Sequence, residues 1–287
     1  MKIKTKRSKK KLGLPAALLL CCMFFLAGFY ASTFLSQDVP VIKPRLRMLD
    51  VVNEEDESKH QDMPHGVTGE AYVESIPFQV LSWKPRAVYF PNFATPEQCE
   101  TIIKAAKVHL KPSALALRKG ETDENTKGTR TSSGTFISSS EEETGTLAFI
   151  EQKISRATMI PASHGEAFNI LRYEIGQKYD SHYDSFNPTE YGPQMSQRVA
   201  SFLLYLSDVE KGGETMFPFE NGAQISSFDY RNCVGLKVKP RQGDGILFYS
   251  LLPNGTIDQT SLHGSCPVIE GQKWVATKWI RDQVQMD

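Results

Sequence analysis

The sequence has no excess of charge of either sign, because 33 lysines and arginines balance 33 aspartates and glutamates over 287 residues. A nucleic-acid-binding surface needs a broad basic excess to neutralise phosphates, so we expect no nucleic acid among the partners. The motif H-E-x-x-H, in which one helix places two histidines on a zinc ion, is also absent. Its absence argues against a zinc protease.

The basic residues are unevenly distributed, with a block of seven lysines and arginines and no acid in residues 1–11. Residues 12–35 then contain no charged side chain. About 20 apolar residues suffice to cross a membrane, whereas the apolar region of a cleaved signal peptide usually has about 7–15. We therefore expect a transmembrane signal anchor at 12–35, rather than a signal peptide or a buried core helix. The basic block at 1–11 then stays in the cytosol, which gives a single-pass type II topology.

The chain beyond the span is then expected in the lumen of the secretory pathway. Residues 36–79 are polar and include an acidic run at 53–57, which is typical of a flexible stalk. The chain ends in DQVQMD instead of a KDEL-type retention signal, so the sequence does not distinguish between the endoplasmic reticulum and the Golgi membrane as its location. Asn254 begins the glycosylation sequon Asn-Gly-Thr in an expected turn, which fits a lumenal glycoprotein.

Cysteine is scarce, with five residues in the chain. Cys21 and Cys22 fall in the apolar run, where we interpret them as apolar filler, with palmitoylation as the alternative. Cys99, Cys233 and Cys266 would meet an oxidising compartment in which disulfides persist. We expect Cys233 and Cys266 to pair because both lie in the strand-rich C-terminal part, although the sequence does not fix the connectivity.

Two helices are expected before the strand-rich part of the chain. Residues 95–110 have a threonine N-cap, a proline at the first helical position and apolar residues at helical spacing. Residues 145–158 form a second amphipathic segment. The intervening stretch 118–143 is polar and rich in glycine, serine and threonine, so we expect a long loop. A lid over a binding site and an idle surface loop are equally compatible with it.

After the second helix the apolar pattern becomes strand-like. Seven short runs, separated by turns rich in glycine, proline and asparagine, are expected to contain strands: 168–184, 198–209, 213–219, 235–240, 243–251, 261–268 and 273–280. Many short strands at this spacing are typical of a sandwich or barrel. The sequence thus predicts a mainly β fold with N-terminal helices (α+β), as one domain at 80–287.

An H-x-D pair is the first candidate for a metal site. If the segment is extended, His182 and Asp184 point to the same face of a strand. Such a pair is too short to be specific, so a third ligand is needed. The remaining histidines lie in the stalk, on the first helix, in a loop, or, for His263, in a late strand-forming run. His263 is therefore the best candidate for the third metal ligand.

Two histidines and one carboxylate form the facial triad of non-haem Fe(II) oxygenases. Three protein ligands leave three positions free, of which a bidentate 2-oxo acid takes two and dioxygen takes one. Zinc prefers four-coordinate sites with one open position. Lys273, ten residues after His263, begins an apolar run and is costly to bury without an anion. We interpret Lys273 as the cation that binds the distal carboxylate of the 2-oxo acid. The alternative is that Lys273 stands at the end of the strand and reaches solvent. Lys278 is expected to reach solvent.

Several motifs combine with this spacing: Y-x-x-H-x-D, then RVASFLLYLSDVEKGGETMFP, KPRQGDGILF and SLHGSCPVIEGQKWVATKWI. Together they resemble prolyl 4-hydroxylases of the membrane-anchored type found in plants, which are Fe(II)- and 2-oxoglutarate-dependent dioxygenases. SWKPRAVYFPNF and TRTSSGTFIS extend the resemblance upstream, so that it covers roughly residues 80–283.

The resemblance implies a double-stranded β-helix, or jelly roll, and hydroxylation of peptidyl proline at C4. Dioxygen and 2-oxoglutarate would be consumed, succinate and carbon dioxide released, and L-ascorbate would keep the iron reduced. The residues implied are His182, Asp184 and His263 for Fe(II), Lys273, Tyr173 and Thr215 for 2-oxoglutarate, and Tyr179, Arg198, Glu166 and Trp279 for the peptide. For Tyr179 and Trp279, packing in the core or rim is the alternative.

The implied partners are proline-rich polypeptides, while the oligomeric state is not readable. Two other functions stay open: a related oxygenase acting on another residue such as lysine, and a non-catalytic module that binds proline-rich peptides. One departure concerns Arg281, which stands where relatives often carry a histidine after KWI. If that position touches the peptide, substrate preference differs.

Overall fold

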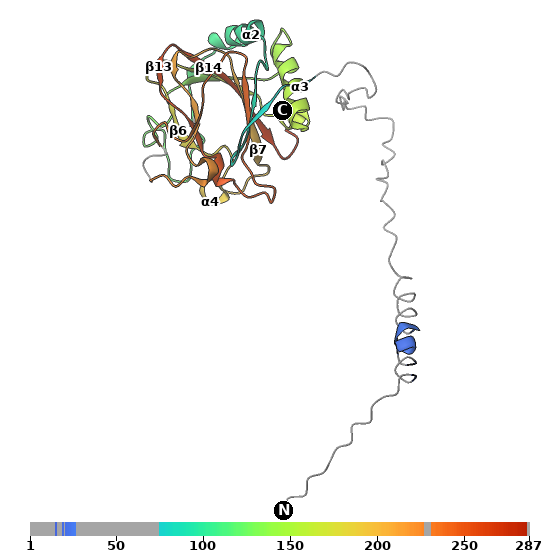
Figure 1. Ribbon diagram of the computed structural model, residues 1–287. Coiled ribbons are helices and arrows are strands. Elements are labelled where there is room, and N and C mark those ends of the chain that lie inside the picture. Colours follow the sequence, from blue (N-terminus) through green and yellow to red (C-terminus); the bar gives the residue numbers. More distant parts are fainter. Residues whose placement is uncertain (1–14, 16–18, 20, 27–74, 227–230, 286–287) are drawn as a thin grey trace, which may run out of the picture. The chain divides into compact units, whose positions relative to one another are not determined.

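The structure is a computed structural model that describes residues 15, 19, 21–26, 75–226 and 231–285 (Figure 1). Its contacts divide the chain into two units, Met1–Asp62 and Met63–Asp287. In the first unit, residues 21–26 are helical. The basic block at 1–11, most of the expected span at 12–35 and most of the stalk lie outside the described residues. No helix in the described part of the chain is both long and apolar enough to cross a membrane.

The second unit is mainly antiparallel β structure, as the sequence predicts. Its largest sheet has eight strands in the order β1-β2-β11-β7-β14-β5-β4-β3. Their bounds are β1 Gln79–Trp83, β2 Arg86–Phe90, β3 Lys111–Pro112, β4 Ser133–Ile137, β5 Phe168–Tyr173, β7 Arg198–Tyr205, β11 Gly245–Tyr249 and β14 Lys273–Arg281. Ile76 already packs against the core, so the folded unit begins a few residues before the expected boundary at 80.

Two smaller sheets complete the fold, with the orders β10-β9-β12-β6 and β13-β8. Their strands are β6 Tyr179–His182, β8 Lys211–Gly212, β9 Thr215–Phe217, β10 Leu236–Val238, β12 His263–Ser265 and β13 Val268–Glu270. Short helical turns lie in the connections between successive elements: η1 Ala162–His164, α4 Pro188–Tyr191, η2 Glu220–Gly222 and η4 Gln259–Ser261. The arrangement is a jelly-roll sandwich.

Both expected helices are confirmed, and they lie near each other on one side of the sheets (Figure 1). α2 spans Pro96–Lys107 and begins with a capping box, in which the side chains and amides of Thr95 and Gln98 bond reciprocally. It ends three residues before the expected position. α3 spans Thr146–Thr158. Apolar residues of both helices, including Ile102 and Ile150, enter one core cluster with residues of the large sheet.

The alternation of β14 separates two cores, because successive side chains of a strand point to opposite faces. Trp274, Ala276 and Ile280 belong to the helix-side core, whereas Val275 belongs to the core between the sheets. The expectation that Lys278 reaches solvent is wrong. Lys278 is on the helix side, 3% exposed, and its ammonium pairs with Glu151 of α3.

Two strand expectations also need correction. The stretch 118–143 is not a continuous loop, because it contains β4, which pairs with β5 from Ser133 to Ile137 and with the short edge strand β3 at Ser133 and Gly134. At Gly134 a Cβ atom would lie 2.6 Å from Leu171, so this polar strand depends on a glycine for its close fit. The run 168–184 is two strands in different sheets, and β6 ends at His182. Asp184 therefore follows the strand rather than belonging to it.

Cys233 and Cys266 form a disulfide in the structure, with their Cα atoms 5.4 Å apart. Cys99 is buried and free. Asn254 is exposed in a turn, where its side-chain oxygen accepts hydrogen bonds from the amide and hydroxyl of Thr256.

Candidate active site

The structure brings His182, Asp184 and His263 together between the two main sheets. One ligand atom from each lies within 4.8 Å of the others. His182 ends β6 and pairs across the ladder with His263, the first residue of β12. Asp184 reaches the same point from the turn after β6. Its carboxylate oxygens lie 3.5 Å from Nε2 of His182 and 3.6 Å from Nε2 of His263.

The imidazole orientations are fixed by backbone carbonyls on the side away from Asp184. Nδ1 of His182 lies 2.9 Å from the carbonyl oxygen of Asp180, and Nδ1 of His263 lies 3.0 Å from that of Ser261. A carbonyl oxygen only accepts, so each Nδ1 carries a proton, and in a neutral ring of this tautomer the lone pair is on Nε2. Burial, the largest effect, lowers the pKa of His263 to about 4, which keeps this imidazole neutral.

Asp184 is held as a carboxylate despite its burial. Burial by itself raises the pKa of a carboxyl group, but the polar and charged groups around Asp184, Arg198 among them, outweigh burial and bring its pKa well below the usual value. The hydroxyl of Ser201 donates to Oδ2 at 2.5 Å, which fixes the carboxylate plane. Two Nε2 lone pairs and one carboxylate converging on a point are a donor set that fits Fe(II).

A second cluster of ligand-type atoms consists of Glu214, Cys233 and Cys266. Its two sulfur atoms are bonded to each other, so neither is a free thiolate for a metal. Within the described residues, the histidine–aspartate cluster is therefore the candidate metal centre.

Lys273 lies in the same pocket, which encloses about 430 Å³ including solvent at its mouth. The lysine is 1% exposed, and its ammonium donates to Ser265 Oγ at 2.9 Å. Burial lowers the pKa of Lys273 to about 7, and Glu214 only partly opposes this. A buried ammonium without a bonded carboxylate is a strong site for an anion. The alternative of a solvent-exposed strand end does not apply.

Hydroxyl groups surround this ammonium. Tyr173 is opposite Lys273 in the β5–β14 ladder, and the ammonium lies 5.3 Å from its ring centroid. Thr215 of β9 lines the pocket and accepts a 2.7 Å hydrogen bond from the Tyr205 hydroxyl. The sequence did not single out Tyr205 or Ser265. Ser265 is two residues after His263, and residues two apart in a strand point to the same face. This spacing is the sequence signal that could have identified Ser265.

Of the four residues expected at the peptide side, Tyr179 and Trp279 line the pocket, whereas Arg198 and Glu166 lie behind Trp279 and do not line it. Arg198 donates two 2.6 Å hydrogen bonds to Glu166, and its guanidinium lies 3.7 Å from the centroid of Trp279. Arg281 donates to the same carboxylate at 2.7 Å and to the carbonyl of Ser196. Glu166 keeps a pKa below its usual value because the arginines outweigh its burial. Arg281 is thus part of an ion-pair network rather than a free side chain.

Tyr179 and Trp279 both line the pocket. The Tyr179 ring stacks on His182 with centroids 3.7 Å apart, and the Arg130 guanidinium carbon lies 4.6 Å from the centroid of the Tyr179 ring. Sequence reasoning did not find Arg130, which comes from the polar stretch before β4. The indole nitrogen of Trp279 is buried and has no hydrogen-bond partner in the structure. It is a donor available to a bound ligand.

Comparisons with known proteins agree with this geometry. Residues 168–281 match the model of the 2OG-Fe(II) oxygenase superfamily. The chain is 75% identical to "Probable prolyl 4-hydroxylase 9" of Arabidopsis thaliana over 278 residues, which is 96% of each protein. It is 57% identical to "Prolyl 4-hydroxylase 13" of the same plant, over 96% of this chain and 97% of the relative.

A solved structure has the same fold: the viral collagen prolyl hydroxylase of Paramecium Bursaria Chlorella virus-1 in its 2OG complex. It is 26% identical and superposes with a TM-score of 0.50, over 68% of this chain and 95% of the viral one. The identity to the plant relatives extends along nearly the whole sequence, beyond the iron-binding core. The chain belongs to the prolyl 4-hydroxylases of plants, within the 2OG-Fe(II) oxygenase superfamily.

Proposed function

We propose that this chain hydroxylates proline residues at C4 in proline-rich polypeptides of the secretory pathway, with 2-oxoglutarate and dioxygen as cosubstrates. The observation that carries the proposal is the presence, in one pocket, of a two-histidine, one-aspartate cluster and a buried lysine that forms no ion pair with a carboxylate of the described residues. A module that only bound peptides would need neither.

His182, Asp184 and His263 would hold Fe(II), which when bound supplies the oxidative chemistry that no amino-acid side chain provides. Ser201 keeps the carboxylate of Asp184 in place, and the carbonyls of Asp180 and Ser261 keep both Nε2 atoms directed at the metal position. The protein thereby fixes the ligands before the metal binds, so little ordering is needed.

Lys273 would bind the distal carboxylate of 2-oxoglutarate, with hydroxyls of Tyr173 and Thr215 as further donors. A bound dicarboxylate supplies the negative charge that the buried ammonium lacks and stabilises its protonated form. The surrounding Leu171, Leu203 and Val275 line the pocket and exclude water from the cosubstrate.

Tyr179, Arg198 and Trp279 would orient the peptide at the mouth of the pocket. A polyproline II segment is already extended, so binding it costs little conformational entropy. It presents carbonyl oxygens, and the free indole N–H of Trp279 is a matching donor. Glu166 and Arg281 hold Arg198 in position over the Trp279 ring, which makes them positioning residues.

We also propose a single-pass type II topology in the endoplasmic reticulum or Golgi membrane, with the catalytic unit in the lumen and a glycan on Asn254. The uncharged run at 12–35, the preceding basic block and the exposed sequon support it. L-ascorbate would keep the iron in the Fe(II) state.

The test is incubation of the full chain with Fe(II), 2-oxoglutarate, ascorbate and several proline-rich peptides. We expect one added oxygen per modified proline by mass spectrometry. Mapping the oxygen to a lysine would instead assign the related oxygenase activity, and succinate without modified peptide would remove the peptide as substrate.

A further inference from the structure

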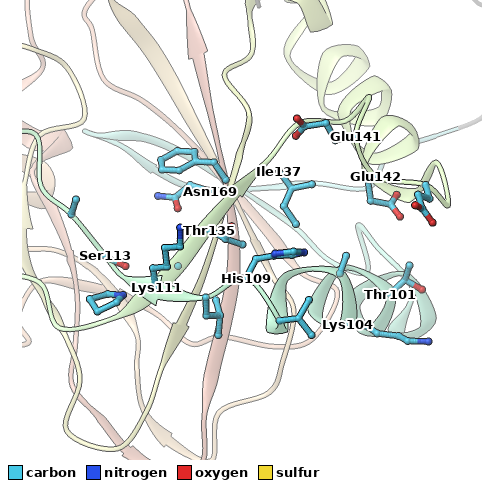
Figure 2. Close-up of a pocket in the computed structure, with 18 of the residues that line it drawn as sticks. Thr101, Lys104, His109, Lys111, Ser113, Thr135, Ile137, Glu141, Glu142 and Asn169 are labelled. Carbon is cyan, nitrogen blue, oxygen red and sulfur yellow. The ribbon is translucent and has the colours of Figure 1, made fainter.

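A large cleft lies beside the β3–β4 edge of the eight-stranded sheet (Figure 2). It encloses about 2320 Å³, solvent at its mouth included. One wall is the C-terminal half of α2 with the segment that follows it, and another is the acidic turn 141–144. Figure 2 shows Thr135 and Ile137 of β4 between these walls.

The edge of β4 in this cleft is only partly paired. β3 pairs with Ser133 and Gly134 alone, whereas β5 pairs with all of Ser133–Ile137 on the other side. Among the described residues, no strand continues β3 along the last three residues of β4. The amide of Ser113 donates to the carbonyl of Ser132. Backbone groups alternate in direction along an antiparallel strand, so the amide and carbonyl of Phe136 also face the cleft.

An open strand edge is a template for an added strand. Such an edge binds an extended polypeptide through its backbone, whatever the side chains. The charged groups of the cleft fit this mode, because exposed lysines, Lys104 and Lys111, and exposed acids, Glu141 and Glu143, line the same space. The mixed signs give no preference for an anionic ligand such as a nucleic acid.

Two residues of the cleft lie next to the candidate peptide site. Arg130 lines both the cleft and the metal pocket. Phe136, which is 61% exposed, has its ring centroid 6.2 Å from that of Trp279. A polypeptide that leaves the pocket over Trp279 therefore passes over Phe136 and reaches the open edge of β4.

We propose that this cleft binds the substrate polypeptide outside the hydroxylated proline, as an extended segment added to the edge of β4. The inference rests on the proposed function and deepens it, because it adds a second requirement to the substrate. The flanking segment needs free backbone N–H groups, which proline lacks. The substrate class is thus a proline-rich stretch joined to an extended stretch with few prolines.

The experiment compares three peptides with the full chain: a proline-rich core, and the same core extended at its N-terminus or its C-terminus by residues other than proline. A few strand-edge hydrogen bonds should lower the KM of one extended peptide about 3- to 10-fold relative to the core peptide. The value of kcat should stay the same, because the reacting proline is unchanged.

Two variants of α2 provide a matched pair. Ala105 lines the cleft, whereas Lys107 on the same helix does not. In Ala105→Trp the indole fills the cleft, so the KM advantage of the extended peptide should disappear while the KM of the core peptide is kept. In Lys107→Trp the advantage should persist.

A second pair isolates the backbone contact. Phe136→Ala removes the ring but keeps the N–H, whereas Phe136→Pro removes both; proline is tolerated where the N–H of an edge strand faces outward. Both substitutions also change the contact between Phe136 and Trp279. In each variant we therefore divide the KM of the core peptide by the KM of the extended peptide, because an effect on the site around Trp279 changes both values equally and cancels. We expect Phe136→Pro to lose more of the advantage than Phe136→Ala.

Hydroxylation of the core peptide with equal KM for all three peptides would overturn the cleft proposal and leave the proposed function intact. No hydroxylation of any peptide would overturn the proposed function. An advantage that falls as enzyme concentration rises would show that a second copy of this chain occupies the edge, which also overturns the cleft proposal.

Discussion

Lys273 is a residue whose charge depends on what the pocket contains. Because burial brings its pKa to about 7, the free enzyme loses the ammonium as pH rises above that value. Bound 2-oxoglutarate favours the charged form, so binding takes up a proton above pH 7. We therefore expect the KM for 2-oxoglutarate to increase with pH above about 7. Kinetics across this range would measure it, and a constant KM would contradict the account.

Substitution of the same lysine gives a second prediction. Lys273→Met should raise the KM for 2-oxoglutarate about 30- to 140-fold, since a charged hydrogen bond contributes about 2–3 kcal/mol, and should abolish the pH dependence. Lys278→Met is the matched control on the opposite face of β14. It should leave this KM unchanged in the folded enzyme. Equal effects of the two substitutions would remove Lys273 from the cosubstrate site.

At this scale the sequence could identify groups whose spacing is characteristic. His182, Asp184, His263 and Lys273 were all predicted and lie in one pocket. Asp184 was assigned to a strand, yet it reaches the cluster from a turn. Ser201 and Tyr205 were not found, because their contacts to Asp184 and Thr215 join separate segments and leave no local pattern. Lys278 was misassigned because a strand pattern does not show that Glu151 of α3 will meet it.

At the scale of elements, the Lys278–Glu151 pair joins β14 to α3. Lys278 is nearly fully buried, so removing one partner leaves an uncompensated buried charge. Glu151→Gln should lower the free energy of unfolding by about 3–5 kcal/mol. The double variant Lys278→Met/Glu151→Leu should recover most of this loss. Denaturant unfolding would measure the free energy of unfolding of both variants. If the double variant lost as much stability as the two single substitutions added together, Lys278 and Glu151 would not act as a pair.

The disulfide is the second link between separate segments. It joins Cys233 to Cys266, which directly follows β12, the strand that carries His263 and Ser265. Cys233→Ser removes a crosslink that spans 33 residues. We expect a loss of about 3–4 kcal/mol in the free energy of unfolding, from the entropy regained by the unfolded chain. Cys99→Ser, at a buried free thiol, is the comparison. It keeps the disulfide and should lose stability under reducing conditions as the wild type does, whereas Cys233→Ser should not respond to reductant.

Element boundaries were predictable where a periodic signal existed. The threonine–proline start of α2 and the apolar face of α3 located both helices. β4 was taken as loop, because its Ser-Gly-Thr residues lack alternation. It forms because β5 offers a partner along its full length and Gly134 permits close approach to Leu171. A strand of this kind is specified by tertiary contacts rather than by its own side chains.

At the scale of the whole molecule, the topology predicts where a glycan can be added. Asn254 is exposed in the catalytic unit, so a type II chain presents its sequon to the lumen. Expression in microsomes should give a product whose mobility changes on deglycosylation, and Asn254→Gln should remove the change. A wild-type chain in intact microsomes that is fully digested by added protease would contradict the topology.

We propose that the histidine–aspartate cluster and Lys273 act together as the catalytic site of a prolyl 4-hydroxylase. This claim is tested most directly by quantifying succinate and 4-hydroxyproline from the full chain with Fe(II), 2-oxoglutarate, ascorbate and a proline-rich peptide. The account predicts equal amounts of both products, and neither product from the His182→Ala variant. Hydroxyproline formation that is unchanged in His182→Ala, or none from the wild type on several proline-rich peptides, would contradict it.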